Sequence, residues 1–152
     1  MSDNRLEARV GEALRAKGWT VSAAESCTGG LIMHRLTNIP GSSAYVQGGV
    51  VAYSYESKET LLKVRPETLL TYGAVSAETA VEMVRGVMAL FGTDVGVSIT
   101  GIAGPGGGMP GKPVGQRTSP WRPRVACCAS SITFGQVTAR RSSTLAPTAR
   151  WR

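Results

Sequence analysis

The segment Ala24–Gly30 combines a carboxylate, two small hydroxylated side chains, a thiol and a glycine pair in one short stretch. It follows the apolar run 19–23 and precedes residues 31–36, which we expect to be helical. The first N–H groups of such a helix are free to face an anion, and the glycines allow a ligand to approach the backbone closely. Ser26 and Thr28 are therefore candidates for a nucleophile, a ligand or a helix cap. The alternative is a plain strand-to-helix turn; a Walker A loop is excluded because no Lys-Ser/Thr pair follows the glycines.

Helices and short apolar strands are predicted to alternate along the chain and to position this turn. The helices are predicted at 3–17, 29–39, 56–62, 67–70 and 77–91, and the strands at 19–24, 45–54 and 95–100. This order is typical of a layered α/β domain, in which ligands bind beyond the carboxyl ends of the strands. Two glycine-rich turns, after Ala24 and after Thr100, follow strands in that sense.

Local signals set the expected element boundaries. Leu6, Val10 and Leu14 are spaced as on one face of a helix, which Ser2 or Asp3 would cap and Gly18 would end. The pair Gly48–Gly49 suggests a bulge or a close backbone approach in the second strand, and Pro66 is suited to a first helical position. Ser76 is the expected cap of the helix at 77–91, and Gly92 is its expected end.

Composition narrows the class of protein. A chain of 152 residues with 42% apolar content is sufficient for one domain, and no apolar run approaches the ~18 residues of a membrane span. The N-terminus lacks the apolar stretch of a signal peptide, and three cysteines without metal spacing, including Cys127–Cys128, indicate neither a disulfide framework nor a metal site. We therefore expect a cytoplasmic protein without membrane partner, metal or cofactor, with its single histidine, His34, on the surface.

The net charge of +7 is unevenly distributed. Residues 1–115 contain ten Lys and Arg and ten Asp and Glu, whereas residues 116–152 contain seven Arg and no Lys, Asp or Glu. The high charge therefore belongs to the tail, and we do not expect a nucleic-acid partner. Binding of nucleic acid through the tail remains an alternative, and deletion of residues 116–152 would then abolish it.

Six strings in the same order resemble the C-terminal domain of the CinA competence/damage-inducible proteins, which also occurs as a stand-alone nicotinamide-nucleotide amidase. They are Ala24-Glu-Ser-Cys-Thr-Gly-Gly30, Pro40-Gly-Ser-Ser-Ala44, Gly49-Val-Val-Ala-Tyr-Ser54, Gly73-Ala-Val-Ser76, Ser98-Ile-Thr-Gly-Ile-Ala-Gly-Pro105 and Lys112-Pro-Val-Gly115. The resemblance implies a three-layer α/β/α domain that hydrolyses the carboxamide of nicotinamide mononucleotide to nicotinic acid mononucleotide and ammonia. It also implies a metal-free serine–lysine site in a self-associating protein. The alternative function is a non-catalytic interaction protein linked to competence or DNA damage.

The resemblance suggests roles for individual residues. Lys58 is the expected base, because burial lowers the pKa of an amine, although a solvated lysine is the alternative. Tyr53 would share the proton or hold the lysine. Ser26 is the preferred nucleophile, with Ser42 or Ser43 as the rival, and the sequence does not choose between them. A substrate-binding set that surrounds these groups is expected from Glu25, Thr28, Gly29, Gly30, Ser43, Thr100, Gly101 and Gly104.

Within this set, Glu25 would orient Lys58 or bind the ribose of the nucleotide. Backbone N–H groups of residues 28–30 would form an oxyanion hole or bind the 5′-phosphate. Thr100 and the loop 101–105 would form the other wall of the site.

The resemblance ends at Gly115. Residues 1–115 are predicted to form an amidase-like domain whose C-terminal part is incomplete, and the Arg-rich residues 116–152 to be disordered or translated out of frame. Translation of the other two reading frames past Gly115 tests this: a strand–strand–helix pattern supports the frameshift. Because lost strands leave apolar side chains uncovered, we expect this chain to fold less stably and to have reduced activity. A sharp cooperative unfolding transition would contradict that expectation.

Overall fold

The computed structural model describes residues 5–102 and the backbone of residues 133–134. The elements, in chain order, are α1 (Leu6–Lys17), β1 (Val21–Glu25), α2 (Leu31–Thr37), the 3-10 turn η1 (Ser42–Ala44), β2 (Val46–Val51), α3 (Tyr55–Leu62), α4 (Pro66–Tyr72), α5 (Ala77–Phe91), β3 (Val95–Thr100) and β4 (Thr133–Phe134). The predicted alternation of helices and strands over residues 5–102 is confirmed. The short strand β4 lies in a segment where the sequence indicated no strand.

The strands form one sheet in the order β2-β1-β3-β4. β1 lies in the centre and pairs in parallel with β2 and with β3, whereas β4 runs antiparallel to β3. Parallel pairing brings the carboxyl ends of the three long strands to one edge of the sheet. The turn that begins at Ser26 lies at that edge.

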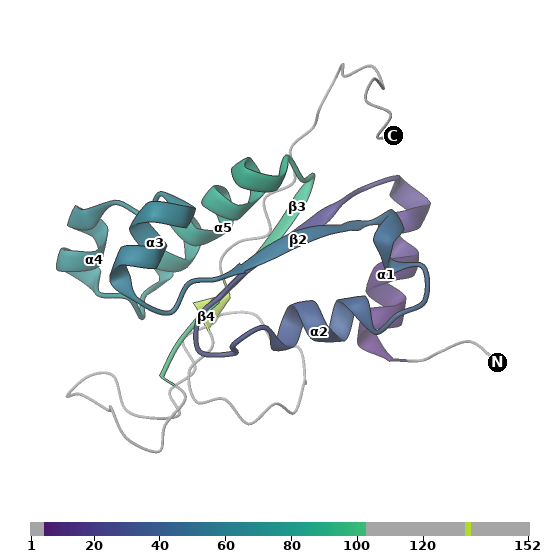
Figure 1. Ribbon diagram of the computed structural model, residues 1–152, viewed down its shortest axis with the longest axis horizontal. Coiled ribbons are helices and arrows are strands. Elements are labelled where there is room, and N and C mark those ends of the chain that lie inside the picture. The colour runs from purple at the N-terminus through teal and green to yellow at the C-terminus, as the bar shows by residue number, and fades with distance from the viewer. Residues whose placement is uncertain (1–4, 103–132, 135–152) are drawn as a thin grey trace.

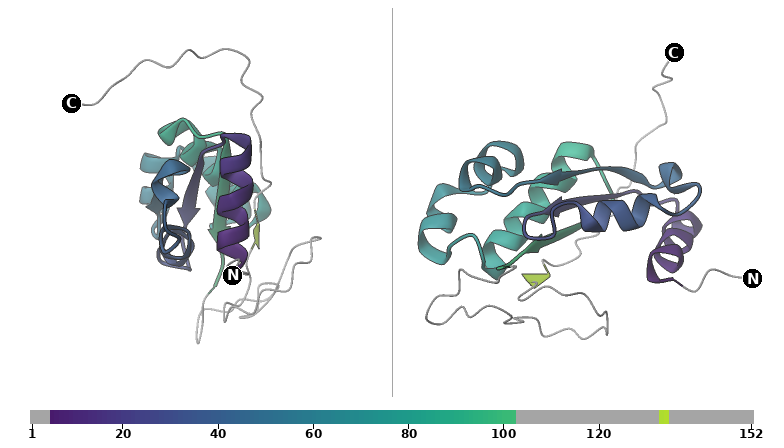
Figure 2. Two further views of the ribbon diagram at one scale, coloured as in Figure 1. Left: turned by 90° about the vertical axis from the view of Figure 1, so that its right-hand side faces the viewer. Right: turned by 60° about the horizontal axis from the view of Figure 1, so that its bottom comes forward.

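Helices cover both faces of the sheet, so the domain has the three α/β/α layers that the sequence predicted (Figures 1 and 2). One core cluster contains Leu14 of α1, Leu36 of α2 and Val21 of β1. The other contains Ala24 of β1 together with buried side chains of α3, α4 and α5. Val21 and Ala24 are an odd number of residues apart on one strand, so they point to opposite faces.

Most local signals have the predicted effect. Gly18 ends α1 in the left-handed conformation at φ 63°, Pro66 is the first residue of α4, and the Ser76 hydroxyl caps α5 by accepting the N–H of Thr79 at 3.2 Å. The predicted caps Ser2 and Asp3 lie outside the described residues.

The apolar face predicted for the first helix is partly wrong. Leu6 and Val10 are exposed, and the buried side of α1 is formed by Ala8, Gly11 and Leu14. The helix packs closely enough that Gly11 lies against Tyr45, so a small residue lies at the contact instead of a large one.

The pair Gly48–Gly49 in β2 shows both features that the sequence suggested. The register between β1 and β2 shifts next to the pairing of Val21 with Val46, and a Cβ on Gly48 would overlap the ring of Phe91. A Cβ on Gly49 would overlap Met33 of α2. The glycines therefore let helices approach β2 closely on both faces.

Candidate active site

The structure brings Ser26 and Lys58 together, although 32 residues separate them in the chain. Ser26 follows β1 directly, and Lys58 lies on α3, which follows β2. The Lys58 Nζ and Ser26 Oγ are 3.1 Å apart. This is the contact that activation of a serine by a neighbouring base requires.

The Lys58 amine is buried, so the alternative of a solvated lysine is wrong. Lys58 is 0% exposed and Ser26 is 7% exposed. Burial lowers the pKa of the Lys58 amine, and the neighbouring Cys27 opposes this only in part. Among the described residues no carboxylate pairs with the amine. The neutral, proton-accepting form of Lys58 is therefore favoured relative to a lysine in water.

Two backbone carbonyls orient the amine. Lys58 Nζ donates to the carbonyl oxygens of Ala52 at 2.8 Å and of Tyr53 at 3.0 Å, just beyond the end of β2. A neutral amine has two N–H bonds and one lone pair. When the carbonyls accept both N–H groups, the lone pair is left for the hydroxyl proton of Ser26.

The Glu25 carboxylate does not contact Lys58, which corrects one of its two expected roles. It is 1% exposed, and its oxygens accept the Thr28 hydroxyl at 2.6 Å and the backbone N–H groups of Gly30, Ile32 and Met33 at 2.9–3.1 Å. Glu25 therefore caps α2 from the residue that ends β1. Three of these bonds are to Oε2 and one, from Met33, is to Oε1, and the expected role of Glu25 in binding the ribose stays a prediction.

Hydrogen bonds within the chain also engage two of the three N–H groups that were expected to bind an anion, those of Gly29 and Gly30. The N–H of Gly29 donates to the Ser26 carbonyl, and that of Gly30 to Glu25. Among the described residues, the N–H groups of Cys27 and Thr28 donate to no oxygen. The amide groups left for a developing oxyanion therefore lie one to two residues after Ser26, and the α2 terminus is filled by the protein's own carboxylate.

Ser26 and Thr28 do not cap α2, so the cap alternative for these hydroxyls is also wrong. The cap position is Gly30, and no side chain at that position caps the helix. The Thr28 hydroxyl donates to Glu25, and the Ser26 hydroxyl contacts Lys58.

The rival nucleophiles Ser42 and Ser43 lie at the other end of the sheet. Both belong to η1, which precedes β2, whereas Lys58 follows β2. A six-residue strand is about 20 Å long, so the two serines do not reach the amine of the same chain. The Ser42 hydroxyl donates instead to the Thr37 carbonyl at 3.3 Å. Figure 1 shows α1 beyond one end of β2 and α3 beyond the other.

The side chains of two other predicted site residues, Tyr53 and Thr100, form no hydrogen bond with Ser26 or Lys58 among the described residues. The Tyr53 side chain is 75% exposed, and the carbonyl of this residue, not its phenol, holds Lys58. The Thr100 hydroxyl donates to the Ala74 carbonyl at 2.6 Å, so it supports a loop. Gly101 follows β3 at the site's edge of the sheet, whereas Gly104 lies outside the described residues.

Neighbouring groups do not compete with Ser26 as a nucleophile. Burial raises the pKa of the half-buried Cys27 thiol, which keeps it protonated and unreactive at neutral pH. His34 is exposed on α2 and contacts Asn38, as predicted for a surface residue. Within residues 5–102, no three His, Cys, Asp or Glu side chains gather as metal ligands would.

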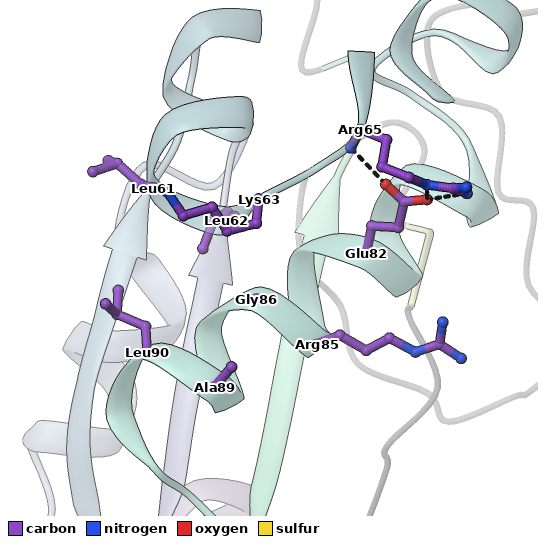
Figure 3. A pocket seen from close by; sticks show the side chains of 9 residues that line it. All are labelled: Leu61, Leu62, Lys63, Arg65, Glu82, Arg85, Gly86, Ala89 and Leu90. Carbon is purple, nitrogen blue, oxygen red and sulfur yellow. Dashed lines mark hydrogen bonds and ion pairs between the residues drawn. The ribbon is translucent and has the colours of Figure 1, made fainter. Parts of the chain in front are cut away.

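A separate hollow of about 690 Å³ lies between the end of α3 and α5 (Figure 3). Leu61 and Leu90 flank one end of it, and the ion pair of Arg65 with Glu82, at 2.7 Å, flanks the other. Neither Ser26 nor Lys58 lines this hollow. It therefore belongs to a different surface from the serine–lysine pair.

The sequence missed two features of the site. Nothing in the residue types of Ala52 and Tyr53 indicates that their carbonyl oxygens orient a lysine, because backbone groups carry no sequence signal. The role of Glu25 had a weak signal: a carboxylate shortly before a helix N-terminus is a favourable partner for its free N–H groups.

The chain is similar to known proteins over most of its length. A model of the CinA C-terminal domain family matches residues 3–145, past Gly115 where the resembling strings end. A CinA-like protein of Chloroherpeton thalassium is 57% identical over 114 residues, which are 75% of this chain and 27% of the relative. This chain thus spans about a quarter of the length of that relative. The nicotinamide-nucleotide amidohydrolase PncC of Enterobacter agglomerans is 52% identical over 118 residues, which are 76% of this chain and 72% of the relative.

Solved structures match over the same region. The competence/damage-inducible protein CihA of Agrobacterium tumefaciens has a TM-score of 0.71 and 49% identity, covering 72% of this chain and 67% of that one. No helix in the described ranges is long and apolar enough to cross a bilayer. The matching family model, the relatives and the fold lead to one assignment: this chain belongs to the CinA C-terminal domain family.

Proposed function

We propose that this chain is a nicotinamide-nucleotide amidohydrolase, which converts nicotinamide mononucleotide and water to nicotinic acid mononucleotide and ammonia. The observation that carries the proposal is the 3.1 Å contact between Ser26 Oγ and a buried lysine amine that no carboxylate pairs with among the described residues. The PncC relative, 52% identical, supports the choice of substrate.

In the first step the neutral Lys58 amine accepts the proton of the Ser26 hydroxyl while the oxygen attacks the carboxamide carbon. The carbonyl oxygen of the substrate becomes negatively charged, and the N–H groups of Cys27 and Thr28, which donate to no protein oxygen within the described residues, are the candidates to stabilise it. Lys58 then donates the proton to the leaving nitrogen. The C–N bond breaks, ammonia leaves, and the acyl group stays on Ser26.

In the second step water attacks the acyl ester, and Lys58 accepts its proton. The bond to Ser26 Oγ breaks, Lys58 returns its proton to the serine oxygen, and the carboxylic acid product gives its remaining proton to solvent and leaves as the carboxylate. Both steps use the same lone pair, so the two carbonyls that orient the amine serve the whole cycle.

The nucleotide's phosphate binds elsewhere than at the α2 terminus, because Glu25 already occupies the N–H groups there. A phosphate at this point would be repelled by the nearby carboxylate of Glu25. We therefore assign the phosphate to another part of the substrate-binding surface.

Ammonia release from nicotinamide mononucleotide by the full chain tests the proposal. We expect Ser26→Ala to lower kcat by at least about a thousandfold, because removal of a nucleophile leaves only binding and electrostatic effects. The matched controls are Ser42→Ala and Ser43→Ala, which should keep the rate of the unaltered chain. Each variant should show the circular dichroism of the parent.

Two results would count against the proposal. Equal loss of activity in Ser42→Ala would contradict the assignment of the nucleophile. A folded parent chain that releases no ammonia would favour the alternative, a non-catalytic interaction protein linked to competence or DNA damage; the Agrobacterium tumefaciens protein is named for competence and damage.

A further inference from the structure

The peptide that joins Glu25 to Ser26 is fixed from both sides. The Glu25 carbonyl accepts the N–H of Ala52 beyond β2 at 2.8 Å, and the Ser26 N–H donates to the Ile99 carbonyl of β3 at 3.0 Å. The backbone of the nucleophile is therefore held by both strands that flank β1. Its side-chain direction then depends on the path of the residues that follow.

The Glu25 carboxylate sets that path. It draws the Thr28 hydroxyl and the N–H groups of Gly30, Ile32 and Met33 toward the end of β1. The buried carboxylate accepts four hydrogen bonds through its two oxygens, whereas a neutral amide at the same place has one acceptor oxygen instead of two. The turn from Ser26 to Gly30 is thus held by hydrogen bonds to Glu25, the residue that precedes it.

From these contacts we infer that Glu25 is a positioning residue: its carboxylate fixes the turn so that the Ser26 hydroxyl faces the Lys58 amine. The inference rests on the proposed function, since it assigns a role within the same serine–lysine site. Glu25 has no contact with the reacting atoms and acts through the turn alone.

The direction of the carboxylate has a second consequence for the amine. A carboxylate paired with Lys58 would stabilise the ammonium and remove the base. Glu25 instead faces the first turn of α2, and its hydrogen bonds all go to residues 28–33. Loss of the Glu25 charge should therefore lower the rate of reaction at Ser26. The pH at which the Lys58 amine titrates should stay unchanged.

Labelling of Ser26 by a small sulfonyl fluoride, measured by mass spectrometry on the full chain, tests the inference without the nucleotide. The amplitude of labelling counts correctly folded sites, and the rate constant reports how well the hydroxyl and the amine are aligned. For Glu25→Gln we expect the rate constant and kcat to fall together by about 10- to 100-fold, because small displacements of reacting groups have effects of this size. KM should change little, and the midpoint of the pH profile should stay in place.

Thr28 provides a matched pair of variants. Thr28→Val removes one donor to Glu25 at nearly constant volume and should lower the labelling rate in the same direction, by a smaller factor. Thr28→Ser keeps the hydroxyl and should restore the rate of the parent chain.

The possible results separate this inference from the proposed function. Labelling of the parent at Ser26 without ammonia release would overturn the proposed amidase activity. The labelling rate of Glu25→Gln would still test the role of Glu25. A reduced amplitude in Glu25→Gln at unchanged rate constant would overturn the inference, because Glu25 would then only stabilise the fold. A shifted pH midpoint, or a parent chain whose Ser26 is not labelled, would overturn it as well.

Discussion

The turn at Ser26 and the turn at Ser42–Ser43 look alike in sequence and differ completely in their surroundings. Each presents serine in a turn that contains glycine and is flanked by a helix and a strand. Ser26, however, follows a strand, whereas Ser42 and Ser43 precede one. In a parallel sheet that order decides which edge a residue occupies, so the two turns lie at opposite edges.

The burial of the two turns differs as well. Ser26 is nearly buried against Lys58, whereas Ser42 is half-buried, Ser43 is exposed, and the Ser42 hydroxyl donates to a nearby carbonyl. A hydroxyl becomes a nucleophile through its neighbours, and the buried amine reaches only the first turn. A serine in a glycine-containing turn therefore indicates a nucleophile only when the position of the turn in the sheet is known.

Removal of the Lys58 amine should have the largest effect. Lys58→Met keeps most of the length of the side chain without the amine and should lower kcat by at least about a thousandfold, as loss of the base should equal loss of the nucleophile. The exposed Lys63, on the turn after α3, provides the control, because Lys63→Met should keep the rate of the parent chain. Ammonia release measures both, and similar losses in the two variants would contradict a special role for the buried amine.

The pH dependence of kcat and of stability also tests the buried Lys58 amine. Burial lowers the pKa of Lys58 from its ordinary 10.5, and the neutral amine is the active form, so kcat should rise with pH and level off above the lowered pKa. In the unfolded chain the amine binds its proton more readily, so stability should also increase as pH rises from the lowered pKa to 10.5.

Denaturant unfolding at neutral and mildly alkaline pH measures the second effect, and Lys58→Met should lack that part of the increase. A kcat that falls as the pH rises through this range would contradict the proposed base.

Two helix glycines, Gly86 and Gly11, allow close packing against different kinds of partner. A Cβ on Gly86 of α5 would overlap the backbone carbonyl of Leu62 at the end of α3, whereas a Cβ on Gly11 of α1 would meet the side chain of Tyr45. Backbone yields less readily than a side-chain tip. Gly86→Ala should therefore cost about 3 kcal/mol of unfolding free energy and Gly11→Ala about 1 kcal/mol.

Because α3 carries Lys58, Gly86→Ala should also lower kcat among folded molecules, whereas Gly11→Ala should not. Thermal unfolding and ammonia release, corrected for the folded fraction, measure the two effects. Equal kcat in the two variants would show that the position of α3 does not limit the reaction.

The smallest expected effect concerns the turn behind the amine. Lys63 has φ 56°, and it is the non-glycine residue with positive φ in the described ranges. Lys63→Gly should relieve the strain of the left-handed conformation and stabilise the fold by about 1 kcal/mol, with kcat unchanged. Lys63→Ala is the control, because alanine retains the strain, and a stabilisation as large as that of glycine would contradict this explanation.

Much of the fold was predictable because its signals are local. Helix periodicity, the serine cap at Ser76 and the glycine stops each act within a few residues, and these elements form where they were predicted. The apolar face of α1 was not predictable in detail, since Gly11 is buried there only because Tyr45 packs against it. Spacing alone does not show which side of a helix meets another element.

The candidate site was predictable in its residue types and less so in its roles. Ser26 and Lys58 were singled out from their motifs, and the structure brings the two side chains into contact. Glu25 and Thr100 were assigned to the substrate, yet their side chains bond to the protein itself. Polar residues near a site serve either purpose, and only the positions of neighbouring donors and acceptors distinguish the two.

The sequence by itself determined the order of helices and strands over residues 5–102, the turn at Ser26 and the family to which the chain belongs. The tertiary structure alone decided that Lys58 is buried, that its amine meets Ser26 and not Ser42, and that Glu25 caps α2. The physical reason is that parallel strands bring together residues that follow them, however far apart these lie in the chain. Burial then changes the chemistry of an amine that would be unremarkable in water.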